Sequence, residues 1–324
     1  MLSGGTGTPK LLQGFMRVVD QKDLSIIVNT GEDVEVSGLH VSPDLDSVMY
    51  TLAGIIDEQK WWGIRGDSFI TNEFLKLLGE NELLRLGDRD RAINIYRTLL
   101  MERGVKLSEV TKTLCSRFGI KANVLPMSDD KVRTLIHTEA GPMWFHQFLI
   151  ARQAKDVVTG VEYVGAENAE PAPEVLETIS KAEAVIIGPS NPITSIGPIL
   201  SIKKIKEALI LNREKVIAVS PIIGDSAVSG PAGALMRGLN YEVSPAGVAR
   251  IYQEVASKLV VDSADKNYGA DIAKLGIKPI FLDILMKDIS TKKRLASEIV
   301  SIVKMERELF RHEKMSAQNL IKAK

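Results

Sequence analysis

The chain has 324 residues, of which 41 are basic and 41 are acidic, so its formal net charge at pH 7 is zero. Balanced charge gives no electrostatic reason to expect nucleic acid or an anionic membrane as a partner, and a single cysteine, Cys115, excludes an intrachain disulfide. No apolar stretch reaches the ~18 residues of a membrane span, and the N-terminus lacks the apolar core of a signal peptide. We therefore expect a soluble, cytoplasmic protein that captures anionic ligands through local groups.

The chain begins with a glycine-rich turn, SGGTGTPK (residues 3–10), directly before a helical pattern. Glycines let backbone N–H groups approach an anionic oxygen, and the N-terminus of a helix carries partial positive charge. The spacing is not that of a P-loop, because no Ser or Thr follows Lys10, and it is not the dinucleotide fingerprint GxGxxG. We predict a phosphate cradle at Gly5, Thr6 and Gly7, with an ordinary turn after an edge strand as the alternative.

Short β-branched runs and helical patterns alternate along most of the chain. The runs at 24–30, 182–191, 215–221, 257–263 and 278–284 are apolar on both faces and end in polar or Gly/Pro turns. Such runs are typical of buried parallel strands. Helical spacing at 173–181, 202–209 and 244–256 then predicts an α/β fold with a doubly wound, mostly parallel, Rossmann-like sheet. Only Met1 and Leu2 precede the glycine-rich turn at 3–10, so the first strand is expected to be stunted, or the true start lies upstream.

Residues from about 48 to 120 break this alternation, because they show helical patterns and no convincing strand. We interpret them as a mainly helical insertion that covers one side of the sheet. Strand character returns at 122–127 and 132–141, and a charged helical tail follows at about 300–324. The predicted organisation is a single α/β domain over 1–324 with this insertion and tail.

Carboxylates follow the second strand and precede the next helical run. NTGED (29–33) is followed by SPDLDS, in which Asp44 and Asp46 are two residues apart. In an extended turn both carboxylates can face one cation, and hard oxygen ligands of this kind suit Mg²⁺. The alternative is that one aspartate merely caps the helix that begins near Val48.

Three further segments are rich in polar residues. RLGDRDR (85–91) contains Arg85 and Asp88, and a solvated, self-paired helix start is its simpler explanation. The loops at 187–198 and 220–233 are rich in Gly, Ser and Asn and are longer than the ~2–6 residues that connect strands and helices. We interpret them as parts of a pocket for a nucleotide or a phosphate ester.

Seven segments in this order resemble the 2-phospho-L-lactate transferases, which act in the biosynthesis of coenzyme F-420: SGGTGTPK, NTGED, SPDLDS, WWGIRGD, LGDRD, GPSNP and SPIIGDSAVSGPAG. The resemblance extends from Ser3 to at least Asp288. It implies transfer of a phospholactyl or related three-carbon phospho-acid group from a guanosine diphospho-lactate donor. The acceptor is the 5′-hydroxyl of the ribityl chain of 7,8-didemethyl-8-hydroxy-5-deazariboflavin, GMP is released, and Mg²⁺ is the cofactor. The expected partners are these two substrates, and neither nucleic acid nor a membrane is expected. Whether the protein forms a homodimer is left open.

The resemblance gives the candidate residues roles. Asp44 and Asp46 are assigned to Mg²⁺ and to catalysis by orienting the acceptor hydroxyl. Trp61 and Trp62 are candidates for stacking on the deazaflavin, although aromatic residues beside a helix are usually core. The candidate substrate-binding residues are Gly5, Thr6, Gly7, Asn29, Arg85, Asp88, Ser190, Asn191 and Gly224.

Two other functions are alternatives. A related family of sugar-nucleotide-binding regulatory proteins shares the SGGTG opening, and such a protein would bind a nucleotide without turnover. The paired aspartates of DLD and the LGDRD segment favour the transferase. A nicotinamide-dependent dehydrogenase is weakened by the missing GxGxxG.

Overall fold

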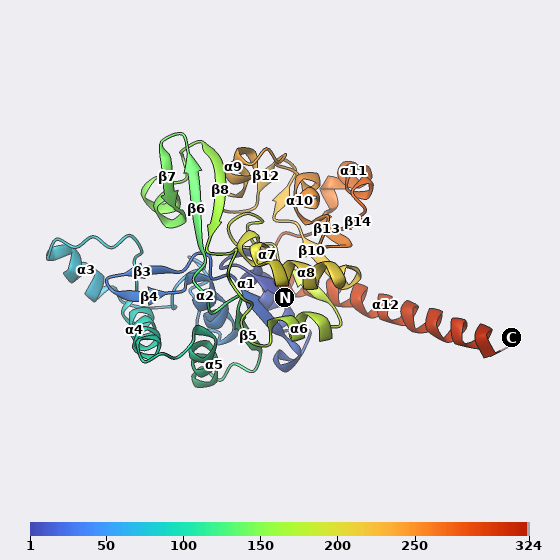
Figure 1. Cartoon of the computed structure of the whole chain (residues 1–324), viewed down its shortest axis with the longest axis horizontal. Coiled ribbons are helices and arrows are strands. Elements are labelled where there is room, and N and C mark those ends of the chain that lie inside the picture. The colour runs from blue at the N-terminus through green and yellow to red at the C-terminus, as the bar shows by residue number, and fades with distance from the viewer. Residues whose placement is uncertain (323–324) are drawn as a thin grey trace.

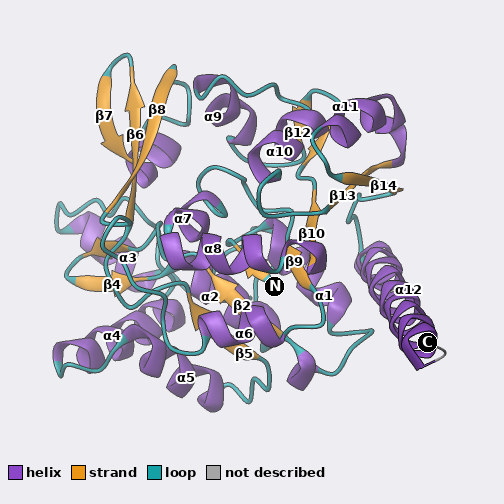
Figure 2. Cartoon of the chain, turned by 45° about the vertical axis from the view of Figure 1, so that its right-hand side comes forward, coloured by secondary structure: helices purple, strands orange, loops and turns teal. Residues whose placement is uncertain are grey.

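The centre of the computed structural model is a seven-stranded sheet with helices on both faces (Figures 1 and 2). The structure describes residues 1–322, with side chains as far as residue 308. All strand pairs of this sheet are parallel, in the order β14-β13-β10-β9-β1-β2-β5. The strands are β1 (Leu2–Ser3), β2 (Ser25–Val28), β5 (Asn123–Pro126), β9 (Val185–Ile187), β10 (Val216–Val219), β13 (Lys258–Asp262) and β14 (Lys278–Leu282). The predicted doubly wound α/β fold is thereby confirmed.

Successive residues of the strands supply apolar side chains to opposite faces of the sheet. Ile27 packs in the cluster on one face, whereas Ile26 and Val28 pack in the cluster on the other. This is the alternation that a strand imposes, and burial of both faces explains why these segments read as continuous apolar runs. The first strand has only two residues, as predicted, yet it lies inside the sheet, where Leu2 pairs with both Ile27 and Ile187.

Helices cover both faces of the sheet. Those outside the insertion are α1 (Gly7–Phe15), α6 (Val175–Lys181), α7 (Gly197–Ser201), α8 (Lys203–Leu211), α9 (Ala232–Gly238), α10 (Pro245–Tyr252), α11 (Gly269–Lys274) and α12 (Ile289–Lys322). The start of α12 packs closely on α1, since a side chain at Gly14 would clash with the carbonyl oxygen of Lys292. The later turns of α12 extend away from the body of the molecule (Figure 1). No helix within residues 1–322 combines the length and the apolar character needed to cross a membrane.

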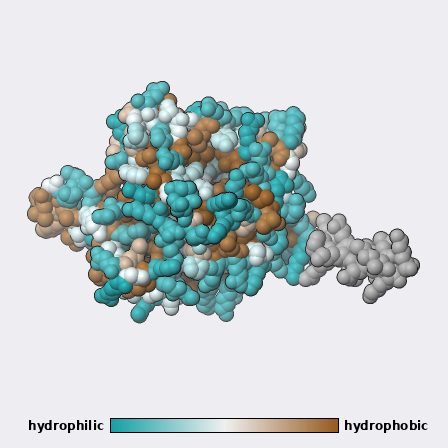
Figure 3. Space-filling view, viewed as in Figure 1, coloured by the Kyte–Doolittle hydropathy of each residue, from teal (hydrophilic) through white to brown (hydrophobic). Residues whose placement is uncertain are grey.

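The segment from 43 to 117 contains four helices: α2 (Pro43–Leu52), α3 (Ile70–Leu77), α4 (Asp88–Glu102) and α5 (Leu107–Arg117). Helix α3 projects from one end of the molecule (Figure 1). The same projection is coloured as hydrophobic in the space-filling view (Figure 3), because Phe74, Leu77 and Leu78 are more than half exposed.

Smaller sheets lie outside the central one, and the sequence did not predict them as separate units. A hairpin of β3 (Val34–Val36) and β4 (Leu39–Val41) precedes α2. An antiparallel sheet joins β6 (Arg133–Thr138), β7 (Gly141–Trp144) and β8 (Val158–Val164), and β11 (Ile222–Ile223) pairs with β12 (Ser226–Ala227). Strand character was expected only in the segment that contains β6, and β3, β4, β11 and β12 have two or three residues each, too few for alternation to be recognised.

The order of the strands determines where a ligand can enter. From β1 the chain proceeds to β2 and β5 on one side, and later returns to β9, β10, β13 and β14 on the other. The loops that follow β1 and β9 therefore diverge at the carboxyl end of the sheet. This switch in direction is where open α/β sheets bind ligands.

Candidate active site

A cleft of about 290 Å³ opens at the carboxyl ends of the central strands. Its walls come from the loops that follow β1, β2, β9, β10 and β14, and Phe145 and Leu149 approach from beyond β7. The cleft therefore lies at the switch point between β1 and β9. Segments that are far apart in the sequence converge there, as the nucleotide-pocket interpretation requires.

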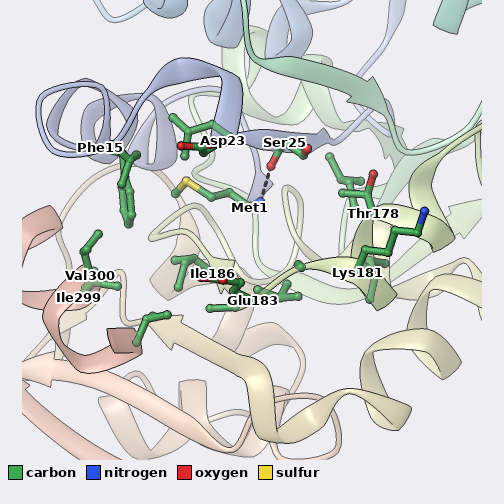
Figure 4. Close-up of a pocket in the computed structure, with 18 of the residues that line it drawn as sticks. Met1, Phe15, Asp23, Ser25, Thr178, Lys181, Glu183, Ile186, Ile299 and Val300 are labelled. Carbon is green, nitrogen blue, oxygen red and sulfur yellow. Dashed lines mark hydrogen bonds between the residues drawn. The ribbon is translucent and has the colours of Figure 1, made fainter. Parts of the chain in front are cut away.

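A larger cavity, of about 830 Å³, lies at the opposite end of the sheet (Figure 4). Its lining includes Met1, Phe15 and Ile186, and the amino group of Met1 donates a hydrogen bond of 2.5 Å to the carbonyl oxygen of Ser25. Neither the glycine turn nor the paired aspartates contribute to it. We place the candidate active site in the smaller cleft, because that cleft gathers the polar groups at the carboxyl ends of the strands.

The predicted cradle forms the turn between β1 and α1 and lines the cleft. Helix α1 begins at Gly7, and the Thr6 side chain makes no cap hydrogen bond. The Ser190 hydroxyl accepts hydrogen bonds from the backbone N–H groups of Gly4 and Thr8, both at 3.2 Å. The loop after β9 thereby holds the glycine turn in place.

The glycines of the cradle are required by packing within the protein. A side chain at Gly7 would clash with the carbonyl oxygen of Pro189, and one at Gly5 would clash with the Asp44 carboxylate. Protein atoms therefore already fill the space beside both glycines. Binding of a phosphate by this turn stays a prediction that concerns its N–H groups.

Asp44 points into the cleft from the first turn of α2. The Asn29 amide donates a 2.9 Å hydrogen bond to Asp44 Oδ2, and Asn29 also donates to the carbonyl oxygen of Thr194 at 3.2 Å. Asp44 is only 4% exposed, and burial raises the pKa of its carboxyl group to about 7. Asn29 has no exposed surface, so it orients Asp44 and does not itself line the cleft.

Glu32 is a second carboxylate of the cleft, which the sequence analysis did not select. Burial and the neighbouring charge of Asp44 raise the pKa of Glu32 well above its usual value. Two carboxylates that disfavour each other's charge are suited to a cation. The position of Glu32 at the end of a buried strand, in NTGED, was the signal that could have identified it.

Asp46 lies on the other side of α2 and does not reach the cleft. Its carboxylate accepts hydrogen bonds from both terminal nitrogens of Arg97, of which the Nη1 to Oδ2 distance is 3.1 Å. The predicted extended turn is wrong, since Pro43 occupies the first position of a regular helix and residues i and i+2 of a helix diverge. The structure therefore does not bring Asp44 and Asp46 together around one cation.

Arg97 is a functional candidate that the sequence analysis missed. It is 1% exposed and also donates a 2.5 Å hydrogen bond to the Asn94 side chain. The Tyr50 hydroxyl donates to Asp90 at 2.7 Å in the same buried region between α2 and α4. Asp90, Asn94 and Arg97 recur at helical spacing, and this buried polar stripe was the available signal.

Arg85 and Asp88 lie outside the cleft lining, near the projecting helix α3. Asp88 accepts hydrogen bonds from the Ser68 hydroxyl at 2.6 Å and from the backbone N–H groups of Thr71 and Ile70, both at 3.0 Å, and these bonds, that of Ser68 most strongly, hold its pKa well below the usual value. The Arg85 guanidinium lies 4.0 Å from the centroid of the Phe69 ring. Asp88 thus organises the start of α3, and contact of either residue with a substrate stays a prediction.

Of the remaining predicted residues, two line the cleft and one does not. Ser190 and Asn191 line the cleft, and the Asn191 side-chain nitrogen is buried with no hydrogen-bond partner among the described residues. Gly224 does not line it. That residue has a φ of +61° in the turn of the β11–β12 hairpin, where its N–H donates to both carboxylate oxygens of Asp265.

Comparison with known sequences places this geometry in context. The family model described as 2-phospho-L-lactate transferase CofD matches residues 1–300. A 2-phospho-L-lactate transferase of Methanopyrus kandleri is 47% identical over 94% of this chain and 96% of its own. Those of Methanocaldococcus jannaschii and Methanosarcina mazei are 46% and 47% identical, each over 93% of this chain, and 96% and 98% of their own lengths are covered.

A solved structure resembles the whole fold. The crystal structure of a protein of the UPF0052 family from Bacillus halodurans superimposes with a TM-score of 0.65 and covers 92% of this chain and 97% of its own. The sequences are 16% identical, so this likeness supports the fold alone.

Proposed function

The chain belongs to the 2-phospho-L-lactate transferase CofD family and is a transferase, and from this premise we propose its reaction in detail. A phospholactyl or related three-carbon phospho-acid group passes from a guanosine diphospho-lactate donor to the ribityl 5′-hydroxyl of 7,8-didemethyl-8-hydroxy-5-deazariboflavin. GMP is the second product, and the reaction is a step of coenzyme F-420 biosynthesis.

One observation carries the proposal. The glycine turn at the start of α1 and the carboxylates of Asp44 and Glu32 line the same cleft at the switch point of the sheet. Displacement at phosphorus requires neutralisation of charge and alignment of the groups more than a covalent nucleophile. A cleft that combines helix N–H groups with carboxylates for a cation is suited to that task.

The residues present fit Mg²⁺. Within residues 1–322 no group of three or more His, Cys, Asp or Glu side chains is arranged as a metal cluster. Mg²⁺ commonly takes only one or two carboxylates and completes its shell with water and phosphate oxygens. Asp44 and Glu32 supply such a pair, and burial raises both of their pKa values, so their charged forms are disfavoured unless a cation lies beside them. When bound there, Mg²⁺ would neutralise charge on the diphosphate.

The other residues position these groups. Asn29 holds one oxygen of Asp44, and Arg97 anchors α2 through Asp46 on the opposite side of the helix. In the proposed reaction the acceptor oxygen forms a bond to the lactate-bearing phosphorus as the bond to the GMP oxygen breaks. The acceptor proton leaves to solvent or to a carboxylate of the cleft.

A product assay tests the proposed reaction. Protein, Mg²⁺, deazaflavin and guanylated donor are incubated, and mass spectrometry is used to detect phospholactyl-deazaflavin and GMP in equal amounts. Reactions with EDTA in place of Mg²⁺ and with the Asp44→Asn variant are the controls. Donor that stays intact in the presence of acceptor and Mg²⁺ would contradict the proposal and favour a sugar-nucleotide-binding regulatory protein.

The guanine base is tested by titration of GDP, ADP and UDP in a calorimeter with Mg²⁺ present. A pocket adapted to guanine leaves buried polar groups unpaired when another base enters, which costs ~1–3 kcal/mol for each group. We expect GDP to bind most tightly. Equal affinities would argue against guanosine, and preference for UDP would favour the regulatory protein.

A further inference from the structure

We propose that Lys10 binds the diphosphate of the nucleotide donor and that Trp61 is a positioning residue that holds Lys10 at the cleft. The inference rests on the proposed function, because it takes a nucleoside diphosphate ester as the ligand. The Lys10 ammonium would supply positive charge to a cleft whose other charged groups named above, Asp44 and Glu32, are carboxylates.

Lys10 is placed to meet an anion. It lies in the first turns of α1 and lines the cleft together with Gly5 and Gly7. Its Nζ lies 5.2 Å from the centroid of the Trp61 ring, and no carboxylate of the described residues is within salt-bridge distance of it. Burial lowers the pKa of Lys10, as expected for an ammonium that has left water without gaining a carboxylate partner.

A second ammonium increases the positive charge at this position. The Nζ of Lys292 lies 4.4 Å from the centroid of the same Trp61 ring. Lys292 is 4% exposed because the start of α12 packs on α1, and its Nζ donates a 2.7 Å hydrogen bond to Gln13 Oε1. It forms an ion pair with Glu58 at an Nζ to Oε2 distance of 3.8 Å. Burial lowers the pKa of Lys292, the charge of Glu58 raises it, and the charge of Lys10 lowers it by less than Glu58 raises it.

Trp61 has an unusual backbone conformation for a large residue. Its φ is +59°, in the left-handed region that favours glycine. A bulky side chain keeps such a conformation only where its surroundings stabilise it, and residues of this kind concentrate at functional sites. Trp61 is held by a 2.7 Å hydrogen bond from its N–H to the carbonyl oxygen of Asp57, by packing of its ring on the apolar core and by the contact of the ring with two ammonium groups. Stacking of Trp61 on the deazaflavin stays a prediction.

An unpaired donor on another wall of the cleft indicates an acceptor-rich ligand independently of the lysines. The Asn191 side-chain nitrogen is buried, lines the cleft and lacks a hydrogen-bond partner among the described residues. A buried amide nitrogen without an acceptor is costly. An oxygen of a diphosphate would accept a hydrogen bond from this group.

The chain contains a matched control. Lys60 Nζ lies 4.7 Å from the centroid of the Trp62 ring, so a second lysine and tryptophan pair exists one residue further along. Neither Lys60 nor Trp62 lines the cleft. Substitution of Lys60 therefore reports the general effect of removing a lysine that lies against a tryptophan ring.

The test is calorimetric titration of inorganic pyrophosphate and of GDP, without acceptor, into the full chain. For Lys10→Ala we expect the dissociation constants to rise about tenfold to a hundredfold, the usual effect of a lost charge-assisted hydrogen bond. For Trp61→Leu we expect a rise of about two- to fivefold, because the cation remains but is less well positioned. Lys60→Ala should bind pyrophosphate and GDP as the unaltered protein does.

A double-mutant cycle separates positioning from a structural effect. If Trp61 acts through Lys10, Trp61→Leu should have no further effect on pyrophosphate binding in the Lys10→Ala protein. Additive losses would show that Trp61 acts otherwise. Circular dichroism melts identify any variant that is unfolded, and Lys10→Gln, which keeps most of the side chain, then replaces Lys10→Ala.

Unchanged pyrophosphate and GDP binding in folded Lys10→Ala would overturn the proposal. The outcome is distinguishable from failure of the proposed function, which the product assay measures separately. If the protein binds pyrophosphate through Lys10 but transfers no phospholactyl group, the proposed anion site is supported and the proposed reaction is contradicted.

Discussion

The two sides of helix α2 carry aspartates of the same motif in opposite environments. On one side Asp44 faces the cleft beside Glu32, and its oriented carboxylate has no cationic partner among the described residues. On the other side Asp46 is paired with both terminal nitrogens of the buried Arg97. Aspartates only two positions apart on one helix therefore belong to different environments, one a cleft that can receive a ligand and the other a buried ion pair.

The difference indicates a division of roles. A buried carboxylate without a cation destabilises the folded protein and is explained by a ligand that arrives later. A buried carboxylate already held by a guanidinium maintains the position of the helix that carries its neighbour. Substitutions on the two sides should consequently affect different measurements.

The largest expected effect belongs to the closed side. Asp46→Asn leaves the buried Arg97 without a counter-charge, which should lower the free energy of unfolding by ~3–5 kcal/mol. Urea denaturation measures it. The double variant Asp46→Leu with Arg97→Met should recover much of the loss, and a stable, inactive Asp46→Asn protein would show instead that Asp46 acts in the reaction.

On the open side the effect should appear in turnover. Asp44→Asn keeps an acceptor for the Asn29 amide but removes the charge that would hold Mg²⁺, so we expect kcat/KM to fall ~10²–10³-fold. Steady-state assays at saturating and limiting Mg²⁺ measure the change. Activity near that of the unaltered protein at limiting Mg²⁺ would remove Asp44 from the metal site and would weaken the contrast between the two sides.

The glycine turn offers a test of intermediate size. In Gly7→Ala the new methyl group meets the Pro189 carbonyl, and we expect a loss of ~1–3 kcal/mol in the free energy of unfolding. Gly233→Ala is the matched control, since the nearest atom to its added methyl group, in Val243, is 3.4 Å away. A Gly7→Ala protein of normal stability that fails to bind GDP would make the glycine a ligand-binding feature after all.

The smallest expected effect is the dependence of stability on pH. The pKa of Asp44 is about 7 in the folded protein, above the ~3.9 of an aspartate in an unfolded chain, so its stabilising contribution is complete below pH ~4 and is lost as pH rises through about 7. Asp44→Asn should therefore match the unaltered protein near pH 4–5 and exceed it by on the order of 1–3 kcal/mol at pH 8. Urea unfolding in EDTA at both values measures this difference. Stabilities that differ equally at pH 5 and pH 8 would contradict the assigned pKa direction.

Local patterns were sufficient for much of the fold. The runs at 24–30, 215–221 and 257–263 became β2, β10 and β13 because side chains buried on both faces of a sheet must be apolar wherever the strand lies. The β3–β4 hairpin escaped prediction, since three residues on each side give too short an alternation to distinguish from a loop.

The sequence by itself determined the fold class, the family and a set of polar residues at strand ends, because these depend on residue type and spacing within short windows. Only the tertiary structure decided which aspartate faces the cleft and which is paired with Arg97. It alone brought Lys10, Trp61 and Lys292 together from α1, the insertion and α12. The partner of a buried charge is selected by packing between distant elements, and spacing along the chain carries no information about that choice.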